Sequence, residues 1–389
     1  MRILHTAEFY SPSVGGAQEV VRQISEQLAR RGHEVTVATT RLPERTSSML
    51  NGVRIEGFSI SGNAVSGYIG ETEAYLRFLS TGRFDVMMNY AAQQWATDLA
   101  YNVLEHLPYR KVLAPCGFSA LFDPQYEPYF RALPETLKHY DHLIFHSCTG
   151  RDSEFARRNG IVHSSVIPNG ASFDEFKDPG VSFRNHYGIP QNEPMLMTVG
   201  SHTGAKGHSV VMEAFRRANI GSATLVVIGN VLGSAGCLPR CRIQARVTEF
   251  ASFGKKKVLL LDPPRREVVS AYHSADLFLF GSNIECSPIV LFEAAASGTP
   301  FVSTACGNAA EIAEWTAAGE ILPTDQTSNG FVRTSAGAMA KVIEELLTDK
   351  PRMERLRDAG IENWKRNFTW EKIAVRYEEL YLRLVSNVG

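Results

Sequence analysis

Two glutamates, Glu285 and Glu293, flank the start of a predicted helix, with seven residues between them. Ser287-Pro288 predicts that start, because serine is a favoured N-cap residue and proline fits the first helical position. The first backbone N–H groups of a helix have no partner within the helix, and they form a natural phosphate site. The spacing therefore predicts a phosphate-binding helix start with carboxylates on either side that accept hydrogen bonds from hydroxyl groups.

The residues around this helix predict a strand before it and a strand after it. Residues 275–280 form an apolar run, Gly298 stands where a helix-ending glycine belongs, and residues 301–303 begin the next apolar run. Alternating strands and helices predict a parallel sheet covered on both faces, and such sheets bind ligands at the carboxyl ends of their strands. The helix start should therefore lie at the ligand-binding edge of a sheet.

The same succession recurs along the chain and predicts two α/β domains. The other predicted strands are residues 2–6, 34–39, 85–89, 111–115, 142–146, 164–168, 195–199 and 223–228. Residues 173–194 are rich in Asp, Asn, Gly and Pro and predict a linker. We expect an N-terminal domain of residues 1–184, a C-terminal domain of 185–368, and a final helix, 369–389, that packs back on a domain.

Composition excludes several classes of protein. Among 389 residues, 40 Lys and Arg balance 41 Asp and Glu, so nothing favours a nucleic-acid partner. Apolar runs fall short of the roughly 18 residues of a membrane span, and the N-terminus shows no signal peptide, so we expect a cytoplasmic protein. Of six cysteines only Cys237 and Cys241 are close together, and without a second pair we expect no metal site.

The segment 283–300, which carries both glutamates, resembles the signature of glycosyltransferase family 4. Gly15-Gly16 is similar to that family's N-terminal glycine loop, 167–170 to its interdomain turn, and 200–207 to its phosphate-binding loop. The resemblance covers essentially the whole chain. It implies the GT-B fold, in which two Rossmann-like domains face each other across a cleft with the donor bound on the C-terminal side and the acceptor on the N-terminal side.

The resemblance also implies roles for individual residues. Glu285 would contact the donor sugar, Lys206 would hold the diphosphate, and both would be catalytic. Glu293 would hold the nucleotide ribose. The full set of implied donor contacts is Gly15, Gly16, Ser201, Lys206, Cys286, Ser287, Pro288, Ile289, Val290 and Glu293.

Two positions depart from the family pattern. Ser201 stands where the family usually has arginine, and Cys116 stands where it commonly has histidine. Neighbouring Asn89, Tyr90 and Phe118 are expected to compensate for the histidine on the sugar and acceptor side.

The expected function is retaining transfer of a sugar from a nucleotide donor to a hydroxyl of a glycan or lipid-linked acceptor, as in bacterial-type surface polysaccharide synthesis. We expect a metal-independent enzyme, since the sequence has no Asp-x-Asp and Lys206 with a helix start can stabilise the leaving diphosphate. No cofactor is expected beyond the nucleotide-sugar co-substrate, whose base is open. The alternatives are a GT-B nucleotide-sugar epimerase and a non-catalytic nucleotide-sugar binder.

Peripheral contact with the inner face of a membrane is expected from the N-terminal domain. The aromatic stretch 118–130 would lie beside the basic residues Arg22, Arg30, Arg31, Arg157 and Arg158.

Overall fold

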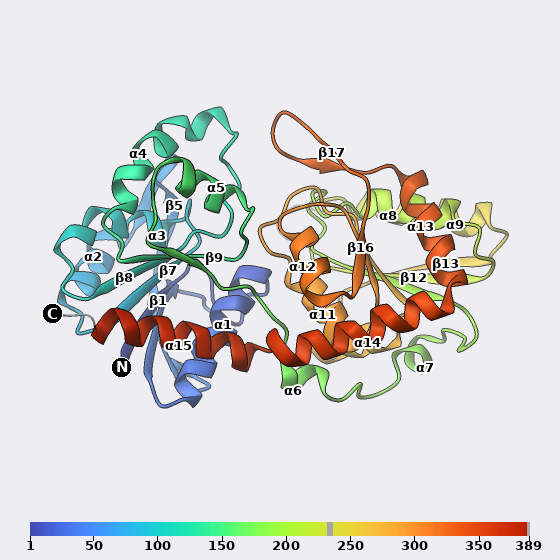
Figure 1. Cartoon of the computed structure of the whole chain (residues 1–389), viewed down its shortest axis with the longest axis horizontal. Helices are drawn as coiled ribbons and strands as arrows, with labels where there is room; N and C mark the ends of the chain where they lie inside the picture. Colours follow the sequence, from blue (N-terminus) through green and yellow to red (C-terminus); the bar gives the residue numbers. More distant parts are fainter. Residues whose placement is uncertain (232–235, 387–389) are drawn as a thin grey trace. The chain divides into compact units, whose positions relative to one another are not determined.

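The computed structural model describes residues 1–231 and 236–386, which form two α/β units (Figure 1). Unit 1 contains residues 1–169 together with the segment from Trp370 to the C-terminus, and unit 2 contains residues 170–369. The chain therefore passes between the units twice.

Unit 1 is built on an eight-stranded sheet with the order β10-β9-β8-β7-β1-β2-β4-β3, parallel except for β3. Its strands are β1 (Arg2–Thr6), β2 (Glu34–Thr40), β3 (Met49–Leu50), β4 (Val53–Phe58), β7 (Val86–Tyr90), β8 (Arg110–Ala114), β9 (His142–Phe145) and β10 (Ser164–Val166), and β5 (Ile60–Asn63) forms a separate hairpin with β6 (Gly67–Gly70). From β1 the sheet grows first through β2 and then, in the other direction, through β7. This reversal is the mark of a Rossmann-like sheet.

The helices of unit 1 are α1 (Gly16–Arg30), α2 (Thr72–Thr81), α3 (Trp95–Asp98), α4 (Glu127–Leu137), α5 (Arg151–Arg158) and α15 (Trp370–Ser386), with 3-10 turns at Ala100–Asn102, Leu104–His106 and Pro124–Tyr126. The last helix, α15, packs against α1. Glu378 of α15 pairs with Arg31 at 2.5 Å and with His33 Nε2 at 2.7 Å. The prediction of a C-terminal helix that packs on a domain is confirmed for residues 370–386, and residues 387–389 lie outside the described part.

Unit 2 is built on a six-stranded, fully parallel sheet with the order β13-β12-β11-β14-β15-β16. Its strands are β11 (Met195–Val199), β12 (Ala223–Ile228), β13 (Lys256–Leu261), β14 (Leu277–Phe280), β15 (Phe301–Ser303) and β16 (Gly319–Ile321), and a small ladder joins β17 (Asp325–Gln326) to β18 (Val332–Arg333). Counted within the unit, this order is 3-2-1-4-5-6, the arrangement of nucleotide-binding Rossmann folds.

The helices of unit 2 are α6 (Phe173–Phe176), α7 (Phe183–Tyr187), α8 (His208–Arg217), α9 (Leu238–Ala251), α10 (Arg265–Ser274), α11 (Ile289–Ser297), α12 (Ala309–Thr316), α13 (Ala336–Thr348) and α14 (Lys350–Asn367). They cover both faces of the sheet, so alternate residues of one strand enter different cores. Met195 and Met197 belong to one apolar cluster, and Leu196 between them belongs to the other. Burial on both faces explains why the strands of this unit are almost continuously apolar.

The boundary between the units lies at residue 169, not near residue 185 as the composition of the linker predicted. Residues 170–184 belong to unit 2 because their apolar side chains enter its core. Phe176 packs edge-on against Tyr272, and Phe183 is 2% exposed. A Gly- and Pro-rich composition marks irregular backbone here, not a solvated hinge.

Candidate active site

The strand order of unit 2 places a ligand-binding crevice between β11 and β14. These strands are direct neighbours, and the chain leaves them toward opposite sides of the sheet. Such a reversal point leaves a crevice at the carboxyl ends of the strands. The loop after β11, residues 200–207, and the loop after β14, residues 281–288, both begin there. The two segments identified from the sequence are thus brought together by topology.

The backbones of these two loops touch. Gly207 has φ +68°, and a Cβ atom there would lie 1.8 Å from the carbonyl oxygen of Gly281. Only glycine allows both the left-handed backbone and this close approach. The N–H of Asn283 donates to the carbonyl of Ala205 at 2.8 Å. The two loops therefore form one rigid platform.

Lys206 and Glu285, the two residues predicted to be catalytic, form an ion pair across this platform. Lys206 Nζ lies 2.6 Å from Glu285 Oε1, and the side chains are 30% and 14% exposed. Ser282 Oγ donates to the same carboxylate oxygen at 2.8 Å. The carboxylate is thus oriented by two donors while the ammonium group remains partly open to a ligand.

Helix α11 begins one residue later than predicted. Pro288 occupies the N-cap position, with φ −70° and ψ 108°, and Ile289 is the first helical residue. Ser287 is therefore not the N-cap, which corrects the sequence interpretation. Proline's extended ψ keeps it outside the helix, and Cys286, Ser287, Ile289 and Val290 line a partly exposed helix start. The phosphate-binding geometry itself needs only the helix start, which stays beside Glu285.

Glu293 lies on the buried side of α11 and is 3% exposed. Arg265, at the first position of α10, pairs with it at 2.5 Å and with Glu175 at 2.7 Å. The Arg265 guanidinium also stacks 5.6 Å from the ring centre of Phe176. A nearly buried carboxylate needs such a cation, because an unpaired buried charge is costly. Sequence analysis missed Arg265, although its place directly after a strand and the Pro263-Pro264 turn was an available signal.

Two further residues near the platform have distinct environments. Ser201 is half-buried and follows Gly200 at the end of β11.

Cys306 is buried, and burial together with the charge of Glu285 raises the pKa of its thiol to about 12. Cys306 therefore remains a neutral thiol at physiological pH and is not a nucleophile.

In unit 1, Gly15 is the N-cap of α1 and Gly16 is the first residue of that helix, which follows β1 at the equivalent reversal point of the sheet. Gly15 has an extended backbone with φ 172°, and a Cβ atom on Gly16 would meet nothing within 4 Å. Neither backbone conformation nor packing within unit 1 requires glycine at position 16.

The four residues predicted on the sugar and acceptor side lie mostly in the core of unit 1. Asn89 is fully buried and bonded to Thr6 and Tyr140, at 2.6 and 2.7 Å. Tyr90 and Phe118 are each 1% exposed. Their burial corrects the prediction that these three side chains face a sugar.

Cys116 is the one of the four that is half-exposed, and its φ of +60° is in the left-handed region. Its Sγ lies 3.8 Å from the hydroxyl of Tyr90. The buried side chains of Tyr90 and Phe118 thus pack beneath the left-handed turn in which Cys116 is half-exposed.

Family models account for nearly the whole chain. Residues 14–175 match the model described as Glycosyltransferase Family 4, and residues 182–363 match the model described as Glycosyl transferases group 1. The chain belongs to glycosyltransferase family 4. This family 4 chain is therefore an enzyme with the GT-B fold, which agrees with the fold and activity expected from its sequence.

Relatives of this family 4 enzyme match it end to end at low identity. A D-inositol 3-phosphate glycosyltransferase of Xylanimonas cellulosilytica is 25% identical, over 98% of this chain and 95% of the relative. Sucrose-phosphate synthase of Thermosynechococcus elongatus has the same fold, with a TM-score of 0.80 and 20% identity over 99% of each chain. The Anabaena protein HepE, solved with UDP-glucose, has a TM-score of 0.74 and 15% identity over 99% of this chain and all of HepE.

The membrane-facing arginines predicted in unit 1 are largely paired with acidic side chains. Arg22 pairs with Glu19, and both Arg157 and Arg158 pair with Glu154. Arg31 pairs with Glu378 as described above. This pairing removes the electrostatic reason for placing membrane contact on unit 1. Among the described residues, no helix combines the length and apolar character needed to cross a bilayer.

Proposed function

We propose that this glycosyltransferase moves a sugar, with retention of anomeric configuration, from a nucleotide-sugar donor to a hydroxyl of a glycan or lipid-linked acceptor. The observation that carries the proposal is the Lys206–Glu285 pair at the β11–β14 crevice. It joins a phosphate-binding cation and a hydroxyl-binding carboxylate at the position where Rossmann-type sheets bind nucleotides.

The proposed roles follow the charges on the donor. Lys206 and the N-terminus of α11 bind the diphosphate, since both stabilise the negative charge that grows as it leaves. Glu293 accepts hydrogen bonds from the ribose hydroxyls, with Arg265 as its positioning residue. Glu285 accepts bonds from the sugar hydroxyls. Gly16, whose missing side chain nothing in unit 1 explains, allows backbone approach to the phosphates.

The proposed reaction needs no protein base. The bond between the sugar C1 and the phosphate oxygen breaks while the acceptor oxygen bonds to C1 on the same face. The acceptor proton passes to the departing phosphate oxygen, so atoms and charge balance. Lys206 is the group that stabilises this oxygen in the transition state.

A small phosphorylated polyol is the second candidate acceptor. The relative named D-inositol 3-phosphate glycosyltransferase aligns over 98% of this chain, so its acceptor class deserves a direct comparison with glycans. The complex of HepE with UDP-glucose makes UDP-sugars the first donors to test.

The test is a transfer assay with UDP-, GDP- and ADP-sugars against lipid-linked glycans and inositol phosphates, with the product's anomeric configuration read by NMR. Retained configuration on a glycan or lipid-linked glycan supports the proposal, and transfer only to inositol phosphates supports the second candidate. Inverted configuration, or turnover of the donor to an epimer without acceptor, contradicts the proposal.

A further inference from the structure

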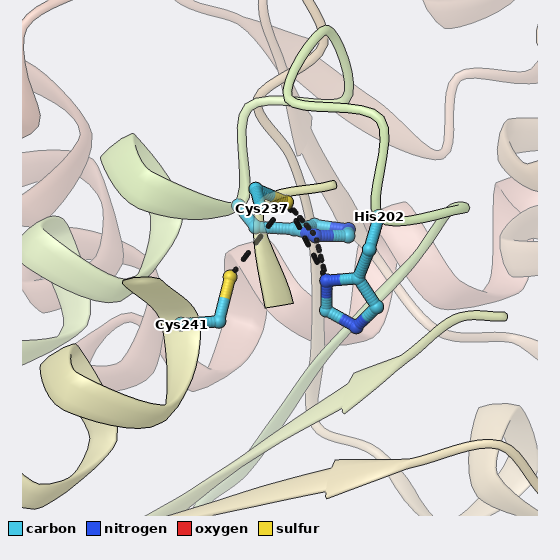
Figure 2. A group of neighbouring side chains, drawn as sticks. His202, Cys237 and Cys241 are labelled. Atoms are coloured by element: carbon cyan, nitrogen blue, oxygen red, sulfur yellow. Dashed lines mark hydrogen bonds between the residues drawn. The ribbon is translucent and has the colours of Figure 1, made fainter. Parts of the chain in front are cut away.

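Four metal-ligating side chains meet beside the loop that carries Lys206. They are His202, near the start of the loop, His208, the first residue of α8, and Cys237 and Cys241, at the start of α9. Figure 2 shows Cys237 between Cys241 and His202, with the imidazole of His202 turned toward the cysteine sulfur. All four ligand atoms lie within 4.8 Å of one another.

The distances between these atoms match those around a tetrahedral ion. With bonds of about 2.3 Å to sulfur and about 2.0 Å to nitrogen, zinc separates two sulfurs by about 3.8 Å, two nitrogens by about 3.3 Å, and a mixed pair by about 3.5 Å. The two Sγ atoms lie 3.8 Å apart and the two Nδ1 atoms 3.2 Å apart. Cys237 Sγ lies 3.5 and 3.7 Å from the two Nδ1 atoms. Closing the tetrahedron requires only that Cys241 Sγ move closer to the two imidazoles, from which it lies no more than 4.8 Å away.

We propose that His202, His208, Cys237 and Cys241 bind one structural zinc ion. The set provides two imidazole nitrogens and two thiolates and leaves no open position, which is the composition of structural and not of catalytic zinc sites. The sequence contains the corresponding spacings, His-x5-His and Cys-x3-Cys. The expectation of no metal site considered only a second cysteine pair. The second pair of ligands here is two histidines about thirty residues upstream of Cys237.

The site is held in place by its own backbone. His202, His208 and Cys241 are each at most 2% exposed. The N–H of Cys237 donates to the carbonyl of His202 at 3.1 Å, which ties α9 to the phosphate loop. A Cβ atom at Gly236 would lie 1.6 Å from that same carbonyl, so only glycine permits the approach. Such pre-positioning lowers the cost of assembling four ligands.

The ion would fix both ends of the loop that holds Lys206. Since His202 precedes Lys206 by four residues and His208 follows it by two, zinc would join the loop to α9 and restrict its movement. We therefore expect loss of zinc to raise the KM for the donor and to leave the chemistry of transfer intact. This consequence rests on the proposed function, whereas the presence of zinc does not.

The test is the metal content of the full chain purified under reducing conditions without chelators or metal-affinity resin. Wild type should carry about one zinc per chain. The double variant Cys237→Ser/Cys241→Ser should retain no more than about a tenth of it. Cys148→Ser, which changes an exposed cysteine elsewhere, is the matched control and should keep its zinc. Cobalt added to metal-free wild type should give thiolate-to-metal charge-transfer absorption.

Wild type that is purified without zinc and gives no charge-transfer band with cobalt overturns the proposal, whether or not the double variant folds. So does a Cys237–Cys241 disulfide in chain isolated under reducing conditions. Equal loss of zinc in Cys148→Ser also overturns it. Because these readouts require no substrate, they stand apart from failure of the transfer reaction.

A second surface is supported by different observations. Helix α9 and the turn after it expose four apolar side chains at helical spacing, which we call the α9 apolar stripe: Ile243, Val247, Phe250 and Phe253. Their exposures are 64, 50, 87 and 95%. Phe253 also has a left-handed backbone with φ +52°, which is rare for an aromatic residue.

Basic side chains are interspersed with the α9 apolar stripe along residues 240–257, a segment that also contains the exposed Glu249. They are Arg240, Arg242, Arg246, Lys255 and Lys257, all exposed. Among the described residues, no carboxylate forms an ion pair with any of the five, in contrast to the paired arginines of unit 1. Aromatic side chains beside unpaired cations are typical of surfaces that bind anionic bilayers. We infer that the α9 apolar stripe docks the enzyme on an anionic membrane surface.

Vesicle sedimentation tests this inference. Wild type should bind vesicles of phosphatidylcholine with phosphatidylglycerol at least about tenfold more tightly than pure phosphatidylcholine. Phe250→Ser/Phe253→Ser should lose this binding, and Phe122→Ser, an exposed phenylalanine of unit 1, should keep it. Equal binding to both vesicles overturns the inference. So does a dimer in light scattering that the double variant dissociates, since the stripe would then bind a second copy.

Discussion

Lys206 and Glu285 lie 2.6 Å apart, although 78 residues separate them in the sequence. The proposed contacts of the two residues differ: Lys206 binds the phosphates of the donor and Glu285 binds its sugar. Their direct pairing places the proposed phosphate contact and the proposed sugar contact next to each other. Substitution of either residue changes the environment of the other.

Glu285→Gln should lower kcat/KM for transfer by about 100-fold or more while leaving the Kd of the free nucleoside diphosphate within about twofold. The amide can still accept a bond from Lys206, but it loses the charge that binds sugar hydroxyls. Calorimetry beside a transfer assay measures both quantities. Equal loss of nucleotide affinity would mean that Glu285 contacts the nucleotide.

Glu293→Ala should weaken binding of the free nucleoside diphosphate about 5- to 150-fold, the cost of losing charge-assisted hydrogen bonds of roughly 1–3 kcal/mol. Arg265→Ala should weaken it less, because the arginine acts through Glu293. In the double variant, removing Arg265 should add almost nothing to the loss from Glu293→Ala. Additive losses in this double-mutant cycle would give Arg265 its own contact with the nucleotide.

In unit 2, the strands near 195–199, 223–228, 275–280 and 301–303 were predictable because their apolar runs and the glycines and prolines between them are local signals, whereas β13 and β16 were not predicted. Residues 195–199 and 223–228 form strands with the predicted bounds. Packing between distant segments was not predictable: nothing in residues 170–184 reveals that Phe176 packs on Tyr272, and nothing around Asn89 reveals that it is buried and accepts a hydrogen bond from Tyr140. The pairing of Arg265 with Glu293 likewise depends on the angle between two helices, which no sequence pattern specifies.

Transfer should not depend on added divalent cations. Brief EDTA treatment should leave the rate unchanged within about twofold, because Lys206 and the α11 start supply the stabilisation that Mg²⁺ gives in other enzymes. Zinc content is measured in the same EDTA-treated sample. Zinc that is retained there belongs to the proposed structural site, and any loss of activity is then compared with the loss of zinc. Activity that falls with EDTA and returns with Mg²⁺ or Mn²⁺ would contradict this prediction.

His5 should make unit 1 less stable in mild acid. It is buried, with Nδ1 2.8 Å from Ser25 Oγ and Nε2 3.2 Å from the hydroxyl of Tyr381, and burial lowers its pKa to about 3. Below pH 6.5 the unfolded chain therefore binds a proton that the folded chain excludes, so stability present above pH 6.5 is lost as pH falls. The cost between pH 7 and pH 5 is about 2 kcal/mol.

Urea unfolding of His5→Gln at these two pH values should show about 2 kcal/mol less acid destabilisation than wild type. His139→Gln, an exposed histidine of the same unit, is the control and should keep the wild-type dependence. An unchanged pH dependence in His5→Gln would mean that His5 is protonated in the folded chain.

Titration of the enzyme with nucleoside di- and monophosphates in the presence of EDTA tests most directly whether the donor's diphosphate lies between Lys206 and the start of α11. Lys206→Ala should weaken binding of the cognate diphosphate about 10- to 100-fold and affect the monophosphate less. Lys341→Ala, an exposed lysine of unit 2, should bind both like wild type. Wild-type diphosphate affinity in Lys206→Ala would contradict the account.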